Sequence, residues 1–270
     1  MSERGLTADQ IDTSVAHPAR MYDYYLGGRD NYEVDRDAAE RIISALPTIV
    51  DGARANRAFL HRAVHTMVAE HGIRQILDIG TGIPTSPNTH EVAQAVEPTT
   101  RVVYVDNDPI VAVHAQARLT GVGHTTFIPG DARRLDEILK RVGDEGLIDF
   151  SQPVGVLMVA LLHFLNDQDN PAAVVGRLRD ALASGSYLVI SHGSGDRATM
   201  ESFEPLAELV DVYRHATAAL TLRSYDQVLS FFEGFDLLEP GLVSVSDWRA
   251  APGSTEPTWI GIYGGLGRKR

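Results

Sequence analysis

The chain has no cysteine among its 270 residues, and this absence excludes several kinds of chemistry. Without thiols there is no disulfide framework, no thiolate metal site and no cysteine nucleophile. Lysine occurs only at positions 140 and 269, and the longest basic run is the terminal Arg268-Lys269-Arg270. The formal net charge is −12. This composition argues against a nucleic-acid partner, because affinity for a phosphate backbone comes from clustered Lys and Arg.

Long hydrophobic runs are also missing. The longest, Val154 to Leu162, is about half the length that a membrane-spanning helix needs. The first thirty residues contain no apolar signal-peptide core. We therefore expect a cytoplasmic protein with no membrane partner. Hydrophobic residues nevertheless make up 44% of the chain, which is enough to build a full core, and the length favours one domain.

After residue 74, apolar runs typical of buried strands alternate with helical patterns, which predicts a parallel sheet with right-handed crossovers. Strands are expected at about 75–79, 101–106, 124–129, 154–160 and 186–191. Later helices are expected over 171–182 and 198–219. Two apolar stretches, 235–245 and 258–263, are expected to form an antiparallel pair at the sheet edge. The predicted fold is a Rossmann-like α/β fold, with seven mostly parallel strands and helices on both faces.

The first 72 residues show helical patterns and no strand. Residues 1–16 lack periodicity and are expected to be a disordered tail. Helices are predicted over about 17–28, 34–46 and 53–70. Residues 17–72 are therefore expected to form a helical cap on an α/β domain of residues 73–270, the two making a single compact unit.

The ends of the first two predicted strands carry the residues of a nucleoside site. The first strand ends in Asp78 and the turn Gly80-Thr81-Gly82, and glycine lets the main chain approach a ligand closely. The second ends in Asp106, where a carboxylate can accept both hydroxyls of a ribose. Thr85 replaces the third glycine of the dinucleotide fingerprint and the next helix opens only at Asn88, so a nucleoside without phosphates fits better than a pyrophosphate. A glycine turn in a protein that binds no nucleotide is the alternative.

A third acidic position follows the third predicted strand. Asp131 can accept a hydrogen bond from an adenine amino group while the backbone amide of Ala132 donates to a ring nitrogen. Asp in such a turn also commonly caps a helix, and the Gly-Asp-Ala pattern alone does not decide between the two roles.

In order and spacing, the segments LDIGTG, YVDNDP, GDAR, VGVLMVALLHFL and SYLVISH resemble the motifs of class I S-adenosylmethionine-dependent methyltransferases over about residues 72–195. A narrower resemblance covers nearly the whole chain. The segments PARMYDYYLGGRDNYEVDRDAAERI, ARANRAFLHRAV, GIRQILDIGTGIPT and EPGLV are similar to a little-characterised bacterial group of S-adenosyl methyltransferases, formerly a domain of unknown function.

The resemblance implies S-adenosyl-L-methionine as the cofactor and assigns contacts to it. Asp78 and the backbone of the Gly80-Thr81-Gly82 turn would face the methionine part, and Asp106 would hold the ribose hydroxyls. The adenine ring would be contacted by three residues, namely Asn107, Asp131 and Ala132.

Residues before the sheet add candidates for the same site. Tyr22 and Asn31 belong to an aromatic, hydrogen-bonding segment that either closes over the cofactor as a lid or packs a helix onto the domain. A predicted helix brings Arg54, Asn56 and Arg57 close together. There are three alternatives for them: they bind the cofactor carboxylate, they contact the lid, or they face solvent.

Two histidines lie at strand ends, where an open α/β sheet places its ligands. His163 follows the fourth predicted strand and His192 the fifth. Each is a candidate general base for deprotonating an acceptor oxygen or nitrogen, and a structural role is the alternative for each. No metal is expected, because no His-x-x-x-His pair with a carboxylate partner emerges from the ten histidines.

The sequence therefore favours transfer of the methyl group of S-adenosylmethionine to a small-molecule acceptor by direct displacement. Such a reaction depends mainly on positioning, and a base is needed only for acidic acceptors. Two alternatives stay open. One is a cofactor-binding protein without turnover, acting as a sensor or scaffold. The other is a nicotinamide-dependent oxidoreductase, which Thr85 and the absence of a Tyr-x-x-x-Lys pair disfavour. The acceptor and the oligomeric state are not predicted.

Overall fold

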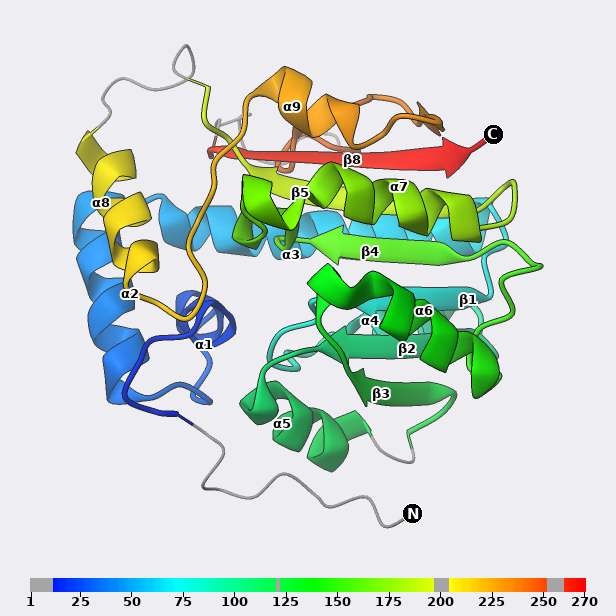
Figure 1. The fold of residues 1–270 in the computed structure, drawn as a ribbon, viewed down its shortest axis with the longest axis horizontal. Coiled ribbons are helices and arrows are strands. Elements are labelled where there is room, and N and C mark those ends of the chain that lie inside the picture. Colours follow the sequence, from blue (N-terminus) through cyan, green and yellow to red (C-terminus); the bar gives the residue numbers. More distant parts are fainter. Residues whose placement is uncertain (1–11, 120–121, 197–203, 252–259) are drawn as a thin grey trace.

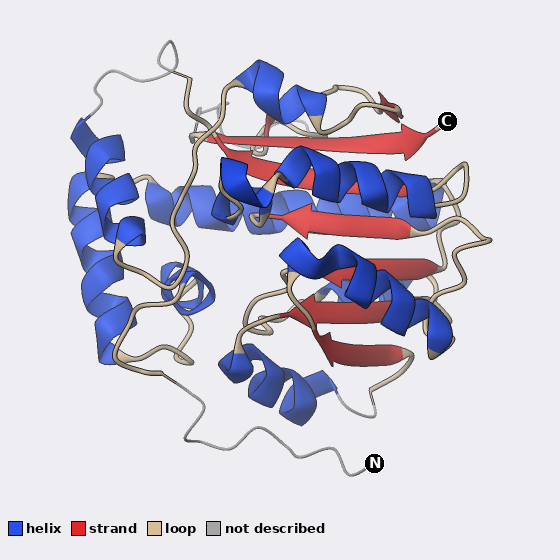
Figure 2. Cartoon of the chain, viewed as in Figure 1, coloured by secondary structure: helices blue, strands red, loops and turns tan. Residues whose placement is uncertain are grey.

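A computed structural model describes residues 12–119, 122–196, 204–251 and 260–270 of the chain. They contain one sheet with the strand order β3-β2-β1-β4-β5-β8-β6, and β7 also pairs with β8. Figures 1 and 2 show the strands flanked by helices in front and behind. The strands are β1 Gln75–Ile79, β2 Arg101–Asp106, β3 Thr125–Pro129, β4 Gly155–Val159, β5 Tyr187–Gly193, β6 Phe235–Leu237, β7 Val243–Ser244 and β8 Ile262–Lys269.

The first five strands are parallel, as predicted. β1 lies between β2 and β4, with Leu77 opposite both Val103 and Val156, and all three side chains are buried. Burial on both faces explains the continuous apolar runs from which these strands were predicted. The predicted Rossmann-like fold with an antiparallel C-terminal edge is confirmed.

The last strand of the antiparallel edge covers other residues than predicted. β8 pairs with β5 from Ile262 to Arg268, so it extends well beyond the predicted stretch 258–263, of which 258 and 259 lie outside the described residues. The cause is a series of glycines. A Cβ added at Gly264 would lie 2.7 Å from the side chain of Val245, so the glycine lets neighbouring side chains pack directly on the strand. Such a strand has no apolar pattern to reveal it.

Two hydrophobic layers hold the helices on the sheet. One combines side chains of α3, α4 and α5 with one sheet face, and the other combines α6, α7 and α9 with the opposite face. The helices are α1 Pro18–Tyr25, α2 Glu33–Ala45, α3 Ile49–His65, α4 Thr89–Val96, α5 Pro109–Leu119, α6 Leu135–Asp144, α7 Pro171–Ala181, α8 Glu204–Arg214 and α9 Tyr225–Ser230.

Helix α6 was not predicted, although Leu135, Ile138 and Val142 recur at helical spacing and are buried. Helix α8 lies within the predicted stretch 198–219, and residues 197–203 of that stretch lie outside the described part.

A third hydrophobic cluster joins α1 and α2 to α8 at the carboxyl ends of the parallel strands. Figure 1 shows these helices side by side, beyond the tips of the strand arrows. On their surface Arg41 of α2 pairs with Glu208 of α8 at 2.7 Å. The helical cap predicted from the N-terminal residues therefore also packs against a helix from beyond β5.

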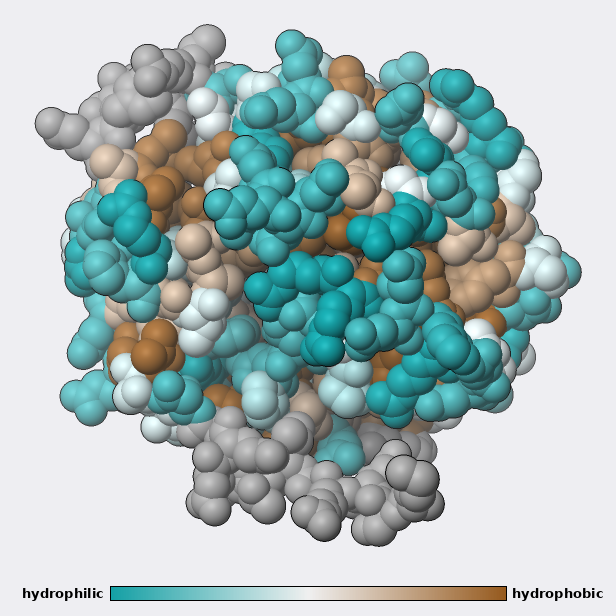
Figure 3. Space-filling model, in the orientation of Figure 1, coloured by the Kyte–Doolittle hydropathy of each residue, from teal (hydrophilic) through white to brown (hydrophobic). Residues whose placement is uncertain are grey.

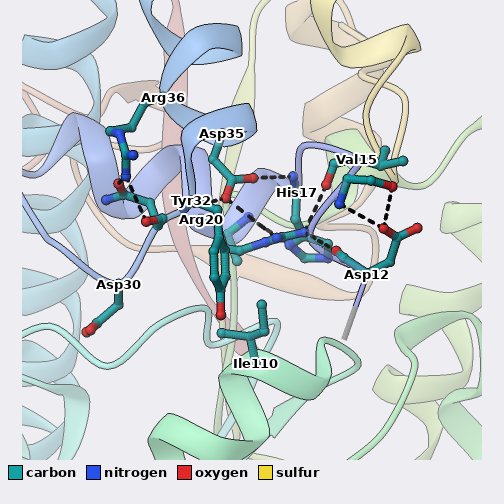
Figure 4. Close-up of polar contacts among 12 residues, drawn as sticks. Asp12, Val15, His17, Arg20, Asp30, Tyr32, Asp35, Arg36 and Ile110 are labelled. Atoms are coloured by element: carbon teal, nitrogen blue, oxygen red, sulfur yellow. Dashed lines mark hydrogen bonds and ion pairs between the residues drawn. The ribbon is translucent and has the colours of Figure 1, made fainter. Parts of the chain in front are cut away.

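Arg20 of α1 joins several parts of this cap from inside (Figure 4). Its guanidinium is 2% exposed and lies 3.5 Å from the carboxylate of Asp35 in α2. It also donates to the carbonyl of Val15 at 3.1 Å, and Ala16 is buried. Val15 and Ala16 of the expected N-terminal tail thus pack on the cap, residues 12–14 are exposed, and residues 1–11 lie outside the described residues. None of the described helices is long and apolar enough to span a membrane.

Candidate functional site

A cavity of about 1040 Å³ lies between the carboxyl ends of the parallel strands and the cap helices α1 and α8. Open α/β sheets bind their ligands at this edge. Most of the sequence-predicted site residues line the cavity, and they come from the ends of four strands and from α1. They are Tyr22, Asp78, Gly80, Thr81, Gly82, Asp106, Asn107, Asp131, Ala132 and His163.

The glycine turn after β1 is bonded to the end of β2. Gly80 and Gly82 have φ angles of 74° and 66°, in the left-handed region that favours glycine. The amides of Gly80 and Thr81 donate to the carbonyl of Val105 at 2.8 and 3.2 Å. The amide of Gly82 donates to Oδ2 of Asp106 at 2.8 Å. The two strand ends predicted to share a ligand therefore form one rigid unit.

Asp106 is a buried carboxylate at the centre of this unit. Its Oδ1 accepts the backbone N–H of Asp108 at 2.9 Å, so each oxygen has one protein donor and keeps acceptor capacity for a ligand. Burial raises the pKa of Asp106 to about 6, because it disfavours the charged form. Asn107 follows it as an exposed residue on the cavity wall.

Asp78 is a second buried carboxylate in the cavity. Its Oδ2 accepts a hydrogen bond from the Thr89 hydroxyl at 2.7 Å. Burial raises the pKa of Asp78 to about 6, while the Thr89 hydrogen bond and the charge of Arg57 act in the opposite direction. A cationic ligand group beside Asp78 would therefore relieve an unfavourable buried charge.

Two residues of α3 that line the same cavity carry buried polar atoms without described protein partners. The Tyr22 hydroxyl donates to the carbonyl of Ala53 and accepts from Nδ2 of Asn56, both at 2.9 Å. Within the described part of the chain, Oδ1 of Asn56 and Nε of Arg57 are buried and have no hydrogen-bond partner. Buried polar atoms are normally paired, so these two fit a ligand with a complementary polar group. Arg57 also donates to the carbonyl of Pro87 at 2.8 Å.

Asp131 caps the short 3₁₀ turn Ala132–Arg134 and faces the cavity. It accepts the backbone N–H of Arg133 at 3.0 Å and pairs with the guanidinium of the same residue at 2.7 Å. Burial raises the pKa of Asp131, but the hydrogen bonds from Arg133 outweigh that effect and the net shift is downward. Of the two roles considered from the sequence, the helix cap is present, and the place of Asp131 on the cavity wall leaves contact with adenine as a prediction.

Asn31 does not line the cavity. Its Nδ2 donates to Oδ2 of Asp23 at 2.8 Å and to the carbonyl of Gly28 at 3.1 Å. Asp23 itself lines the cavity, although no motif in the sequence pointed to it. The close approach of Gly28 to Asp23, where a Cβ would lie 2.0 Å from Oδ1, explains the glycine that closes α1. Asn31 therefore supports a cavity residue and does not itself reach the cavity.

His192 has both ring nitrogens engaged. Its Nδ1–H donates to the carbonyl of Gly193 at 2.8 Å, and its Nε2 accepts from Arg223 at 3.1 Å. Burial lowers the pKa of His192 to about 4. In this arrangement it has no free lone pair and does not line the cavity.

Arg223 is a neighbour of His192 that no sequence motif indicated. It is 4% exposed and donates to the carbonyls of Leu162 and Leu165 at 3.0 and 2.9 Å. It also pairs with Asp167 at 2.8 Å. These bonds fix the turn after β4 that carries His163.

His163 does line the cavity. Its Nδ1 accepts the backbone N–H of Gly193 at 3.2 Å, which places the proton of the neutral ring on Nε2. Burial, His192 and Arg223 lower the pKa of His163 well below its ordinary value. The ring is thus arranged as a neutral hydrogen-bond donor.

Because its pKa is lowered, we expect His163 to remain neutral, with its proton on Nε2, as the pH falls through about 6.5, where a free histidine becomes protonated. Long-range ¹⁵N–¹H spectra of histidine-labelled protein report both the charge and the tautomer, and His163→Gln identifies the resonance. A His163 signal that titrates near pH 6.5, or that shows a proton on Nδ1, would contradict this arrangement.

No cluster of three His, Asp or Glu side chains suited to a metal occurs within the described ranges. The parallel sheet, the glycine turn after β1 and the acid at the end of β2 define a Rossmann-like methyltransferase fold. The model of one family, described as S-adenosyl methyltransferase, matches residues 4–270. The chain belongs to this family.

Solved structures agree with this assignment. The chain is 39% identical to a DUF574 family protein from Streptomyces avermitilis, with a TM-score of 0.90 over 97% of this chain and 100% of that one. It is 37% identical to a protein from Thermobifida fusca described as a putative methyltransferase, with a TM-score of 0.87 over 96% and 97% of the chains. A methyltransferase from Anabaena variabilis shares the fold at 14% identity and a TM-score of 0.50, over 73% and 77%. No curated protein matches the chain.

Proposed function

We propose that the protein transfers the methyl group of S-adenosylmethionine to a small-molecule acceptor by direct displacement. The observation that carries the proposal is the pair of buried carboxylates, Asp78 and Asp106, held on either side of the glycine turn in one cavity. When bound, the cofactor supplies an activated methyl group, whose bond to sulfur breaks with its electrons staying on sulfur.

The residues around the glycine turn match the polar groups of the cofactor. Asp106 would accept the two ribose hydroxyls, and Asp78 would pair with the methionyl ammonium group. The unpaired Oδ1 of Asn56 is a further acceptor for that ammonium, and the guanidinium of Arg57 is the cation available for the methionyl carboxylate. The backbone of the turn, including Thr81, would pass along the methionyl part.

The adenine end would lie against the ends of β2 and β3. Asn107, Asp131 and Ala132 line this part of the cavity. The Asp131 carboxylate is already paired with Arg133, so we assign adenine contact to its remaining acceptor capacity and to the Ala132 amide. Tyr22 forms part of the wall through its ring, because its hydroxyl is bonded to α3.

The chain's contribution to the reaction would be positioning. The cap and the fixed turn after β4 would hold the acceptor in line with the methyl group and limit the access of water. His163 and His192 offer no free lone pair toward the cavity. A proton released by the acceptor would therefore pass to solvent.

The test is ligand specificity. At a hundredfold excess over its dissociation constant, S-adenosylmethionine or S-adenosylhomocysteine should raise the free energy of unfolding by about 2–3 kcal/mol, and NADH should not change it. Titration calorimetry and thermal unfolding measure both effects. Binding of NADH without binding of either adenosyl ligand would contradict the proposal.

Turnover is measured separately from binding. Pools of small phenols, amines and carboxylic acids are incubated with the protein and S-adenosylmethionine, and formation of S-adenosylhomocysteine is followed. Persistent absence of product from a protein that binds the cofactor would favour a sensor or scaffold over an enzyme.

A further inference from the structure

The cavity has two chemically different parts. Its Asp, Arg and His side chains come from the ends of the parallel strands and the loops that follow them, from α1 with its cap His17, and from Arg57 of α3. The opposite wall comes from residues 46–53 and 205–222, and among its described lining residues there is no Asp, Glu, Lys, Arg or His. At about 1040 Å³ the cavity lies at the upper limit for one drug-sized ligand, so the second part offers space for another molecule.

We call this opposite wall the apolar wall. It is formed mainly by branched aliphatic side chains from three segments that pack in one hydrophobic cluster, Leu46, Ile49, Leu206, Leu209, Leu220 and Leu222. Figure 3 shows hydrophobic side chains gathered beside the position of α8, on a surface that is otherwise mainly hydrophilic.

Helix α8 is amphipathic in a way that keeps charge out of the cavity. Its Leu206, Leu209 and Tyr213 face the cavity. Its Glu208 and Asp211 instead approach Arg41 of α2, at 2.7 and 3.6 Å. These two carboxylates are therefore paired outside the wall.

The nearby cations are engaged elsewhere. Arg57 bonds to the loop after the glycine turn and is the cation proposed for the cofactor carboxylate, and Arg133 pairs with Asp131. Arg223 donates to carbonyls of the turn after β4 and to Asp167, and it does not line the cavity. An anionic ligand against the apolar wall would lose its hydration and gain no cation, which is costly.

One fixed polar group adjoins the wall. His163 is held as a neutral ring with its proton on Nε2, and that nitrogen has no hydrogen-bond partner among the described residues. It can donate one hydrogen bond to an oxygen of a bound molecule.

We propose that the apolar wall is the acceptor site and that it selects an uncharged, largely apolar molecule, one oxygen of which accepts a hydrogen bond from Nε2–H of His163. This inference rests on the proposed function, because it assigns to the acceptor the space that the cofactor leaves. It names the substrate class: a neutral hydroxylated aromatic or alicyclic compound, and not a carboxylic acid or an amine that is protonated at neutral pH.

The experiment uses protein saturated with S-adenosylhomocysteine and three probes with the same ring system. 2-Naphthol is neutral, 2-naphthoate is an anion and 2-naphthylmethylamine is a cation at pH 7. Calorimetry should show 2-naphthol binding at least about tenfold more tightly than either charged probe. Equal or tighter binding of a charged probe, or no binding of 2-naphthol, would overturn the inference. Failure of S-adenosylhomocysteine itself to bind would instead remove the proposed function.

A charge placed on the wall should reverse the preference. Leu220 is half-buried in the connection after α8, so Leu220→Lys is expected to fold, and its affinity for S-adenosylhomocysteine should not change. It should bind 2-naphthol about tenfold more weakly and 2-naphthoate more tightly than the wild type. Ala207→Lys, on the exposed face of α8, is the matched control and should leave all three affinities unchanged. Identical probe selectivity in Leu220→Lys and wild type would place the acceptor elsewhere.

The role of His163 has its own pair of variants. His163→Phe should weaken 2-naphthol binding about tenfold, since one hydrogen bond to the ligand is lost. His163→Gln, whose amide can donate in place of Nε2–H, should recover most of that loss. Both should leave S-adenosylhomocysteine affinity unchanged. Unaltered naphthol affinity in His163→Phe would remove His163 from the acceptor site.

Discussion

Asp106→Ala is expected to weaken binding of S-adenosylhomocysteine by one to two orders of magnitude. The carboxylate would accept hydrogen bonds from both ribose hydroxyls, and charge-assisted bonds of this kind contribute about 1.5–3 kcal/mol. That free energy corresponds to about a tenfold to hundredfold change in the dissociation constant. Titration calorimetry of the folded variant measures it directly.

Two further variants and the pH dependence make this result specific. Asp106→Asn keeps an acceptor oxygen without the charge, so its affinity for S-adenosylhomocysteine should lie between those of Asp106→Ala and wild type. Asn107→Ala changes an exposed neighbour and should have a smaller effect.

Because burial raises the pKa of Asp106 to about 6, the carboxylate becomes neutral as the pH falls through that value. The advantage of wild type over Asp106→Ala should therefore shrink below about pH 6. Equal affinity of the two proteins at pH 8 would place the ribose elsewhere.

Asp35→Ala is expected to lower the free energy of unfolding by about 3–5 kcal/mol, because it leaves the guanidinium of Arg20 buried without its nearest counter-ion. Asp35 is fully buried and lies 3.5 Å from Arg20 (Figure 4). Its oxygens also accept the backbone N–H groups of His17 and Tyr32, both at 2.9 Å. Denaturant titration followed by circular dichroism measures the loss.

The control lies on the same helix. Asp37 is exposed, so Asp37→Ala should change stability by no more than about 0.5 kcal/mol. Asp35→Ala should also weaken binding of S-adenosylhomocysteine, because Arg20 approaches Asp108, two residues beyond Asp106, at 3.9 Å. If Asp35→Ala and Asp37→Ala were equally stable, the buried ion pair would not be what holds the cap.

This buried network bears on the two interpretations of the N-terminal segment. Met21 and Tyr25 are buried in the cluster that contains Leu209 of α8. A lid that opens for each ligand would have to expose these side chains and the Arg20–Asp35 pair to water. The packing therefore favours a structural cap that forms one wall of the cavity.

Much of the glycine-turn side of the cavity could be predicted from short segments of sequence. Asp78 and Asp106 end apolar runs whose burial on both sheet faces made them recognisable as parallel strands. The carboxyl ends of adjacent parallel strands lie at one edge, so spacing along the chain was enough to bring these acids together. The capping box of Asn88 and Glu91 likewise depends only on residues three apart.

Only the tertiary structure decided the apolar wall of the cavity and the state of the histidines. His163 and His192 look alike in the sequence, since each follows a strand. The amide of Gly193 donates to Nδ1 of His163, and Arg223 donates to Nε2 of His192, so these two donors decide which ring nitrogen carries the proton. Arg223 is 31 residues from His192. The apolar wall joins the connection between α2 and α3, the start of α3, α8 and the connection after α8, and Glu208 of α8 pairs outside it with Arg41 at a separation of 167 residues. The local sequence determined where each of the five parallel strands ends because that is encoded in the hydrophobic pattern of neighbouring residues. Which side chains face each other across the cavity depends on contacts between distant segments, and no periodicity in the chain records them.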